Sequence, residues 1–270
     1  MVTKSPTVRH RRLGRELRRL RENAGISPES AARQLGWSRP KLNRIENART
    51  MPSPADVGHA CDLFGADSAT KAGLIQLCKD AARRGWWTAY SDVLSGSYVV
   101  LEAEATAIRT WEPLLIPGLL QNEDYARAII ATGRPGLNEV ELRRRVDARM
   151  QRKARLLGET PEFHAVVDEA ALRRRFAPGI MARQLDDLLQ ILERPRTTIQ
   201  VMPLAARPHG GLDGSFSVLS FEEDPDVAYI GGPAGEMYLE SFDRVRGLRL
   251  LFDRLSEIAL SPERSAELIA

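Results

Sequence analysis

Four polar side chains between residues 38 and 47 have the chemistry needed to contact nucleotide bases or an anion. This segment reads Ser-Arg-Pro-Lys-Leu-Asn-Arg-Ile-Glu-Asn, and helical spacing places Leu42 and Ile45 together on an inward face. The outward face would carry donors that suit base edges and phosphate oxygens: Arg39, Lys41, Asn43 and Arg44. An arginine-rich helix face is weak evidence by itself, because charged faces are usually just solvated.

A pair of short helices would position these side chains. Ser38 can cap the second helix, and Pro40 fits its first turn because the N–H groups there have no partner within the helix. Ser27-Pro28 gives the same start to a preceding helix that runs to Leu35. Gly36-Trp37-Ser38 would form the tight turn between them. Two short helices joined by a three-residue turn with glycine are typical of the helix-turn-helix unit, whose second helix enters the DNA major groove.

The segment from residue 13 to residue 64 resembles a known family, the Cro and phage-repressor type of helix-turn-helix. This family is also called the xenobiotic-response-element family. The motifs that carry the resemblance are Leu17-Arg18-Arg19-Leu20-Arg21, Ala24-Gly25-Ile26-Ser27, Ala31-Ala32-Arg33-Gln34-Leu35-Gly36, Ser38 and Ile45-Glu46-Asn47. The resemblance implies a partly buried ion pair between Arg21 and Glu46. It also implies that Arg39 and Arg44 read bases.

The same resemblance implies contacts with the DNA backbone. Ser27, Asn47 and Arg49 stand where the family touches phosphate, and we expect Ser38 to do so as well. Pro28 departs from the family, which commonly has glutamine there, so the backbone contact of that amide is not carried over.

The distribution of charge supports double-stranded DNA as the partner. Residues 1–53 carry thirteen Lys and Arg against four Glu, a balance of +9, whereas the rest of the chain balances at −6, within a total of +3. A positive field that coincides with the helix-turn-helix segment is expected of a segment that binds a polyanion.

The chain is long enough for two domains. We predict a flexible arm at residues 1–12, a five-helix domain at 13–85 and a second domain at 98–270. The first helix would carry Leu13, Leu17 and Leu20, and two more helices would span residues 53–64 and 68–84. Trp86 and Trp87 follow at the boundary. They could form a ligand pocket or interface anchor, although a wedge packed between the domains is the favoured interpretation.

The second domain mixes helices and strands. We predict helices at residues 98–110, 121–131, 138–157, 180–193 and 242–258, and strands at 163–167, 197–202, 214–221, 227–230 and 236–239. The fold class is therefore α+β: an N-terminal all-α domain, then a mixed domain with a small, mostly antiparallel sheet. The helix at 138–157 is crowded with arginine. A solvated face, or a surface complementary to an acidic protein, is expected there rather than a second DNA contact.

The second domain also resembles a family, one of actinobacterial regulators. The motifs are Gly85-Trp86-Trp87, Leu101-Glu102-Ala103-Glu104, Ile116 to Gln121 with Glu123 to Ala128, Ile199-Gln200-Val201-Met202-Pro203 and Ala259-Leu260-Ser261-Pro262. Its members join this type of helix-turn-helix to a C-terminal domain of unknown biochemical function, and they include antitoxin-like and WhiJ-type developmental regulators. The resemblance implies a transcription regulator that often acts with a small, usually acidic protein encoded beside it.

No residue pattern indicates an enzyme, a metal site or a cofactor. The histidines are far apart in sequence, and no nucleophile motif is present. The glycine-rich segments at residues 209–214 and 231–235 lie between predicted strands, so they are turns rather than phosphate cradles. Cys61 and Cys78 fall on apolar helix faces and are expected to be buried thiols. Because the chain has neither a signal peptide nor a spanning segment, we expect a soluble, cytoplasmic and nucleoid-associated protein without membrane contact.

The sequence therefore predicts a sequence-specific transcription regulator. One short reading helix covers only a few base pairs, so we expect a homodimer on an inverted repeat. Two alternatives for residues 98–270 stay open. The domain could capture a small acidic protein, as in an antitoxin whose DNA binding is autoregulatory. It could instead sense a small molecule, with the tryptophan pair and Pro113 to Leu120 near a pocket.

Overall fold

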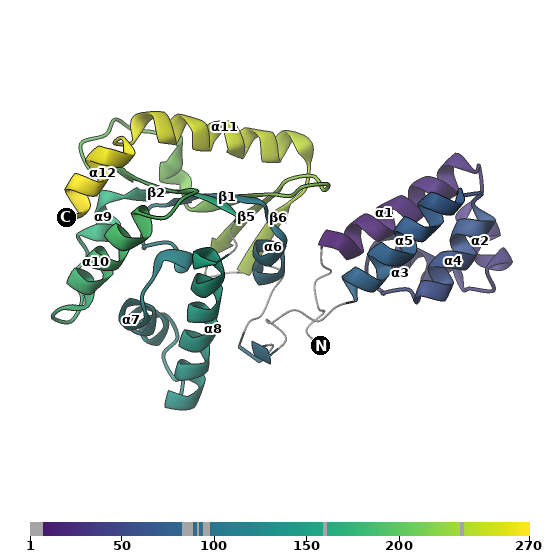
Figure 1. Cartoon of the computed structure of the whole chain (residues 1–270), viewed down its shortest axis with the longest axis horizontal. Helices are drawn as coiled ribbons and strands as arrows, with labels where there is room; N and C mark the ends of the chain where they lie inside the picture. Colours follow the sequence, from purple (N-terminus) through teal and green to yellow (C-terminus); the bar gives the residue numbers. More distant parts are fainter. Residues whose placement is uncertain (1–7, 83–88, 91, 94–97, 159–160, 233–234) are drawn as a thin grey trace. The chain divides into compact units, whose positions relative to one another are not determined.

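The computed structural model describes residues 8–82, 89–90, 92–93, 98–158, 161–232 and 235–270. The chain divides into two compact units, Met1–Thr88 and Ala89–Ala270, and each is described here by itself. The predicted fold class is confirmed, because a helical unit precedes a mixed α+β unit (Figure 1). Trp86 and Trp87, for which a pocket or interface role was predicted, lie outside the described residues.

The described part of the first unit consists of helices. Their bounds are α1 Val8–Asn23, α2 Pro28–Gln34, α3 Arg39–Glu46, α4 Pro54–Leu63 and α5 Ser68–Ala81. The prediction was wrong about where the first helix begins. We expected Leu13, but the helix starts at Val8, so residues 8–12 of the predicted arm are helical. After Val8, residues 9–12 read Arg-His-Arg-Arg and carry no apolar side chain to indicate a helix, although His10 and Arg12 are partly buried.

One apolar core holds the first unit together. Leu13 and Leu17 of α1 are buried with Leu42 and Ile45 of α3, and the cluster continues through α4 and α5. The predicted burial of both cysteines is confirmed, since Cys61 and Cys78 are free, buried thiols. Burial raises the pKa of each thiol, which keeps it protonated and unreactive. The core therefore fixes α3 through its inward side chains and leaves its other face to solvent.

The described part of the second unit contains a six-stranded mixed sheet. Its strands are β1 Ala107–Glu112, β2 Glu162–Asp168, β3 Thr197–Met202, β4 Phe216–Ser220, β5 Val227–Gly232 and β6 Gly235–Leu239. The strand order is β3-β2-β1-β4-β5-β6. The pairs β1–β2 and β2–β3 are parallel, and the pairs β1–β4, β4–β5 and β5–β6 are antiparallel. Antiparallel pairs are the majority, as predicted.

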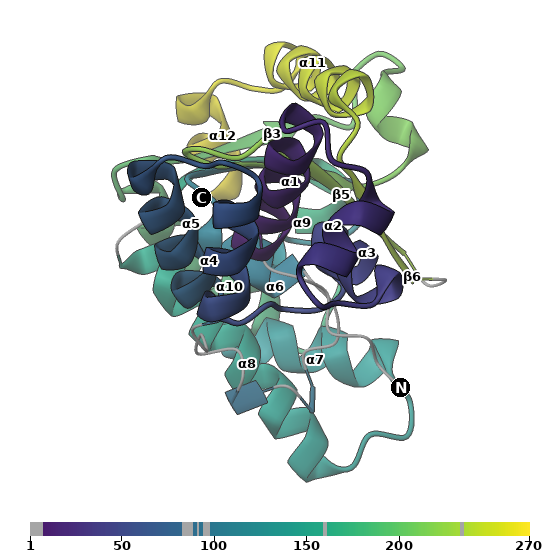
Figure 2. The same ribbon diagram turned by 90° about the vertical axis from the view of Figure 1, so that its right-hand side faces the viewer.

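Helices cover both faces of this sheet (Figures 1 and 2). Their bounds are α6 Tyr98–Glu104, α7 Glu123–Gly133, α8 Glu139–Leu157, α9 Glu169–Leu172, α10 Ile180–Leu192, α11 Phe242–Ile258 and α12 Pro262–Ile269, with short 3-10 turns η2 Gly118–Leu120 and η3 Gly210–Asp213. Helix α11 lies along one face, where Phe252 and Leu255 pack on Trp111 and Val218. Helices α7, α8 and α10 lie on the other side.

The prediction of one helix over residues 98–110 was wrong. Helix α6 ends at Glu104, and β1 begins at Ala107 as a central strand of the sheet. Strand β1 pairs with β2 on one side and with β4 on the other. Ile108 and Trp111 are fully buried. Because both faces of the strand are covered, its residues show no clean alternation of polar and apolar side chains, and pairing with distant strands determines the structure.

The expectation of a solvated basic face on α8 was wrong for three of its seven cations, which pair with acidic side chains of the same unit. Arg144 binds Asp92 with Nε 2.6 Å from a carboxylate oxygen. Arg152 donates two hydrogen bonds to Glu102, of 2.9 and 2.7 Å, and Lys153 pairs with Asp187. The acidic partners lie far from α8 in sequence. Part of the positive charge of α8 is therefore neutralised within its own domain.

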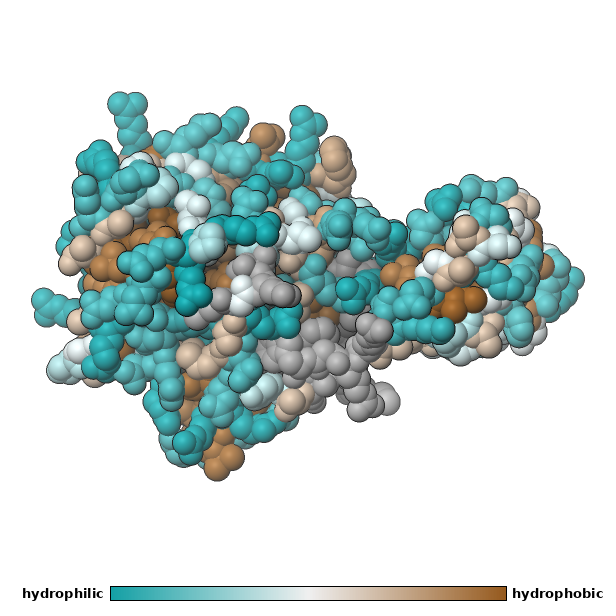
Figure 3. Space-filling view, viewed as in Figure 1, coloured by the Kyte–Doolittle hydropathy of each residue, from teal (hydrophilic) through white to brown (hydrophobic). Residues whose placement is uncertain are grey.

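No helix among the described residues is long and apolar enough to cross a membrane. The face drawn in Figure 3 is mainly hydrophilic over both units, with smaller hydrophobic patches. This distribution agrees with the apolar side chains being gathered in the interior of each unit.

Candidate nucleic-acid interface

Local capping fixes the ends of the two short helices. The Ser27 hydroxyl accepts a hydrogen bond from the Ser30 N–H at 3.2 Å, and the Ser38 hydroxyl accepts one from the Lys41 N–H at 3.2 Å. Between the helices, Gly36 has a φ of +66°, a backbone conformation that glycine adopts without strain. Each serine oxygen accepts a bond while its O–H proton stays free to donate. Both predicted phosphate contacts, Ser27 and Ser38, can therefore cap a helix and bind an anion.

Helix α3 separates into an inward and an outward face. Leu42 and Ile45 are 2% and 1% exposed. Asn43 and Arg44 between them are exposed, and the side chain of Arg39 at the start of the helix is 69% exposed. The face that could meet DNA is thus the face that the core does not use.

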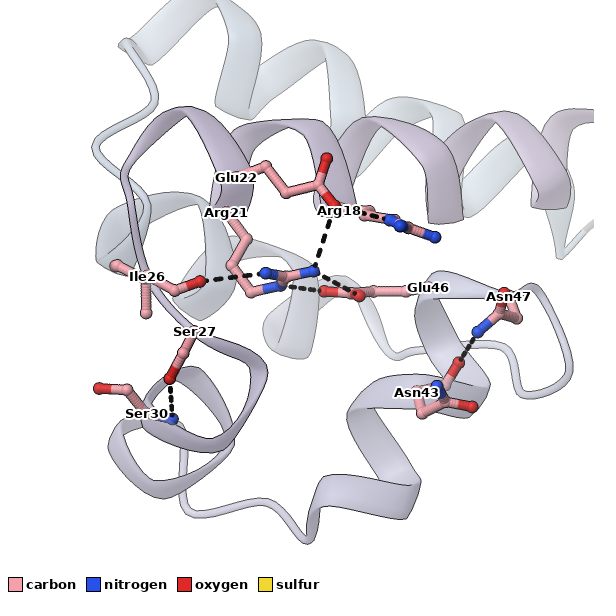
Figure 4. Close-up of polar contacts among 9 residues, drawn as sticks. All are labelled: Arg18, Arg21, Glu22, Ile26, Ser27, Ser30, Asn43, Glu46 and Asn47. Atoms are coloured by element: carbon pink, nitrogen blue, oxygen red, sulfur yellow. Dashed lines mark hydrogen bonds and ion pairs between the residues drawn. The ribbon is translucent and has the colours of Figure 1, made fainter.

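The C-terminal end of α3 is tied to α1 by an ion pair. Arg21 Nε and one terminal nitrogen donate to the two carboxylate oxygens of Glu46 at 2.6 and 3.0 Å, and the remaining nitrogen donates to the Ile26 carbonyl at 3.0 Å (Figure 4). The two side chains are 6% and 7% exposed. This is the pair that the family resemblance implied. The hydrogen bonds that Arg21 donates to Glu46 raise the pKa of Arg21, so its charge is permanent.

A close approach at Gly14 was missed by the sequence reasoning. A Cβ atom at this position in α1 would lie 2.8 Å from the carbonyl oxygens of both Ile45 and Glu46. Real Cβ atoms do not tolerate that separation from backbone atoms, so only glycine lets α1 pass the end of α3 this closely. A glycine inside a predicted helix lowers helix propensity, and that unfavourable choice was the available signal.

Two of the predicted base-reading residues are engaged within the domain. Arg39 Nε lies 2.8 Å from a carboxylate oxygen of Glu29 on α2, and both side chains are largely exposed. Lys41 pairs with Asp56 of α4 at 3.2 Å, and its ammonium lies 4.4 Å from the centre of the Trp37 ring. An exposed ion pair contributes little free energy, so Arg39 can exchange Glu29 for DNA readily. Lys41 is held more firmly.

The side chains of Arg44, Asn47 and Arg49 form no ion pair with another described residue. Among the described residues, neither Arg44 nor Arg49 has a side-chain partner within hydrogen-bond or ion-pair distance, and both are exposed. The chain leaves α3 through Ala48, whose φ is +52°, and the Arg49 N–H donates to the Arg44 carbonyl at 2.7 Å. The Asn47 side chain donates to the Asn43 carbonyl at 2.8 Å (Figure 4). Within the described part of the chain, the last turn of α3 and the residues after it therefore carry two guanidinium groups, Arg44 and Arg49, that have no side-chain partner.

The arrangement is suited to binding an anionic polymer. Capping hydroxyls, side-chain amides and guanidinium groups are all donors to phosphate or to base edges. Within the described residues, no group of three His, Cys, Asp or Glu side chains is placed to hold a metal ion.

Comparisons with known proteins agree with this geometry. Residues 12–74 match the family described as a helix-turn-helix domain, and residues 95–270 match the family described as a domain of unknown function, DUF5753. No curated protein matches the chain. The helix-turn-helix domain indicates a DNA-binding regulator. With well over half of its length matched, the chain belongs to the DUF5753 family, and it carries a helix-turn-helix domain ahead of that domain.

Proposed function

We propose that the protein is a sequence-specific transcription regulator of the Cro and xenobiotic-response-element type. The observation that carries the proposal is the exposed face of α3. It presents the Arg44 guanidinium, which has no partner among the residues that the structure describes, while Leu42 and Ile45 anchor the opposite face in the core. A short helix held in this way can enter a major groove without rearranging its own domain.

In this proposal, two sets of residues have different roles. The base-reading set is Arg39, Lys41, Asn43 and Arg44. The phosphate-binding set is Ser27, Ser38, Asn47 and Arg49. The ion pair of Arg21 and Glu46 keeps α3 at a fixed angle to α1, so the register of the base contacts depends on it. Base contacts determine sequence choice, whereas phosphate contacts contribute most of the affinity and its salt dependence.

We also propose a homodimer that binds an inverted repeat, in the cytoplasm and on the nucleoid of an actinobacterium. The argument for the dimer is the length of α3, which is eight residues. Two such helices on one DNA face, about 34 Å apart, would read two half-sites one helical turn from each other. We assign the chain no enzymatic activity and no cofactor.

The experiment that tests the proposal is selection of bound duplexes from a random library by the full chain. Enrichment of an inverted repeat with half-site centres about 10 base pairs apart is the expected result. The Arg44→Ala variant should enrich a site with one degenerate position per half-site. Lys79→Ala, which removes an exposed cation from α5, is the matched control and should leave the enriched motif unchanged. A library that stays random with the wild-type chain would refute sequence-specific binding.

For residues 98–270, the contacts of α8 weigh against capture of a small acidic protein as the main role. Arg144, Arg152 and Lys153 already pair with acidic side chains of their own domain. The second unit has a cavity lined by Glu112 and Arg149, and this cavity favours the small-molecule sensor instead. Co-purification of a small acidic protein with the full chain, lost when residues 98–270 are removed, would favour the antitoxin-like alternative.

A further inference from the structure

The second unit contains a cavity of about 370 Å³ on the face of the sheet opposite α11. Its floor is a row of side chains from three neighbouring strands: Thr110 of β1, Ser217 of β4 and Tyr229 of β5. The row is continuous because Thr110 pairs in register with Ser217, and Ser217 with Tyr229. A buried sheet face normally carries apolar side chains, so a polar row at this position is unusual for a purely structural surface.

Helix α8 supplies a cationic wall to the cavity. Arg152 is neutralised by Glu102, whereas the Arg149 side chain, in the described part of the unit, donates a single hydrogen bond of 2.6 Å to the Gln121 side chain. No carboxylate lies within ion-pair distance of Arg149 among the described residues. Arg145 donates to the Val93 carbonyl at 2.9 Å, and its buried Nε has no hydrogen-bond partner among the residues described. Two guanidinium groups therefore keep unused donors at one wall of the cavity.

The end of β1 adds a carboxyl group to the same cavity. Glu112 lines it, and among the described residues no donor lies within hydrogen-bond distance of its side chain. Burial raises the pKa of Glu112 to about 7, and the Arg149 charge opposes the shift only in part. Burial likewise lowers the pKa of Arg149 to about 10, with the nearby Arg152 charge adding to the effect. Partly buried charged groups that have no ion-pair partner among the described residues are unfavourable for the empty protein.

We propose that this cavity binds a small organic anion, with its carboxylate or phosphate group held by Arg149 and Arg145 and a hydrogen-bond donor of the ligand directed at Glu112. A guanidinium is planar and matches both kinds of oxyanion with paired hydrogen bonds. The rings of Tyr98 and Tyr229, with centroids 4.3 Å apart, provide an aromatic surface for the body of the ligand. The volume lies in the range of small-molecule sites.

This inference goes beyond DNA binding and does not depend on it. The segment Pro113 to Leu120, which the sequence analysis placed near a pocket, contributes Leu115 and Leu119 to the lining. No motif indicated the row on the floor or the two guanidinium groups, because their partners come together only in the folded sheet.

The test is calorimetric titration of the full chain, without DNA, at pH 7.5. The probes are 4-hydroxybenzoate and phenyl phosphate, which distinguish a carboxylate site from a phosphate site, with benzyl alcohol as the neutral control and benzamidine as the cationic control. We expect at least one anionic probe to bind at least ten times more tightly than either control, since a hydrogen bond to a charged group contributes about 1.5 to 3 kcal/mol. Equal binding of benzamidine, or no binding of either anion, would overturn the proposal.

Variants separate the site from general effects of charge. Arg149→Gln should weaken the bound anion about tenfold or more. Arg143→Gln removes an exposed arginine from the same helix and should have no effect. Glu112→Gln keeps the size of the side chain and removes a competing negative charge, so it should tighten phenyl phosphate or unsubstituted benzoate, a further probe, since neither carries a hydroxyl donor for Glu112. If Arg149→Gln and Arg143→Gln weakened binding equally, or Glu112→Gln weakened binding of benzoate, the anion would not be in this cavity.

Discussion

Arg21 and Glu46 join the first and third helices through two parallel hydrogen bonds of 2.6 and 3.0 Å, with both side chains almost fully buried. Their separation in sequence is 25 residues. The pair is a planar guanidinium facing a carboxylate, the geometry in which a buried charge is best compensated. The orientation of the proposed DNA-reading helix therefore depends on an electrostatic contact at its end as well as on its apolar core.

Glu46→Ala should destabilise the first unit by about 3 kcal/mol or more, because it leaves the Arg21 charge buried without its partner. The measurement is urea unfolding of the full chain followed by hydrogen exchange in peptides from residues 8–82. Glu16→Ala is the matched control, since it breaks a more exposed ion pair with Arg19 on the same helix. The control should change the unfolding free energy by less than about 1 kcal/mol. Equal changes in the unfolding free energy of the two variants would show that burial of the Arg21–Glu46 pair does not add to stability.

Gly14→Ala should destabilise the same unit by about 1 to 3 kcal/mol, because the added Cβ overlaps two backbone carbonyl oxygens at the end of α3. The control is Gly73→Ala in α5, where an added Cβ meets no atom within 4 Å. That change should be neutral or stabilising by up to about 1 kcal/mol, since alanine favours a helix over glycine. Thermal melting of the two variants beside the wild type gives the comparison. Identical melting shifts would contradict the close approach of the helices.

The parts of the fold that local signals specify could be predicted from the sequence. The serine caps of α2, α3 and α4, each followed by a proline in the first turn, and the apolar spacing of Leu42 and Ile45 indicated the helix-turn-helix without any tertiary information. Strand β1 could not be predicted in the same way. Its identity as a strand depends on pairing with β2 and β4, which begin more than 50 residues later in the chain.

For the sites as well, features that depend on local sequence could be predicted, and features that depend on contacts between distant segments could not. The outward residues of α3 follow from helix geometry. The neutralisation of α8 does not, because Asp92, Glu102 and Asp187 reach it from other elements. The cavity could not be predicted either, because Thr110 and Ser217 are 107 positions apart in sequence and become neighbours only through the pairing of β1 with β4.

Arg44→Ala should weaken binding to the selected operator by about 1 to 3 kcal/mol and relax the preference at one base pair in each half-site. The reason is that Arg44 is exposed on α3 and uses none of its donors within the described part of the domain. Binding should be measured by fluorescence anisotropy on the operator, on single-base variants and on random duplex. Equal weakening on all duplexes would instead make Arg44 a phosphate contact.

Arg49→Ala should lower the affinity for every duplex by a similar factor. Arg49 follows α3 and has an exposed side chain, a position suited to a phosphate contact. Each phosphate that the protein neutralises releases condensed cations from DNA, so losing one contact should flatten the slope of log K against log salt by about one. Lys79→Ala serves again as the control for loss of one positive charge. A slope that is the same in the Arg49 variant and the wild type would remove Arg49 from the interface.

Glu112→Gln should change how the stability of the second unit depends on pH. In the folded chain, burial raises the pKa of Glu112 from about 4.5 to about 7. Between these values the folded state keeps a proton that the unfolded state has lost, so the contribution of Glu112 to stability is full below pH 4.5 and is lost as pH rises to 7. The cavity also presents other titratable groups to Glu112, namely Tyr98, Arg134, Arg145, Arg149, Arg152, Tyr229 and Glu236.

Glutamine cannot ionise, so the stability of the variant does not fall as pH rises through the pKa of Glu112. Relative to the wild type it should gain stability between pH 5 and pH 8, by at most about 3 kcal/mol, which corresponds to the size of the pKa shift. Hydrogen exchange in peptides from residues 98–270, compared at the two pH values, measures the difference. Glu139→Gln is the control, because that carboxylate is exposed in its pair with Arg127. If the stability difference between Glu112→Gln and the wild type were the same at pH 5 and pH 8, Glu112 would not be a buried carboxyl that titrates near neutrality.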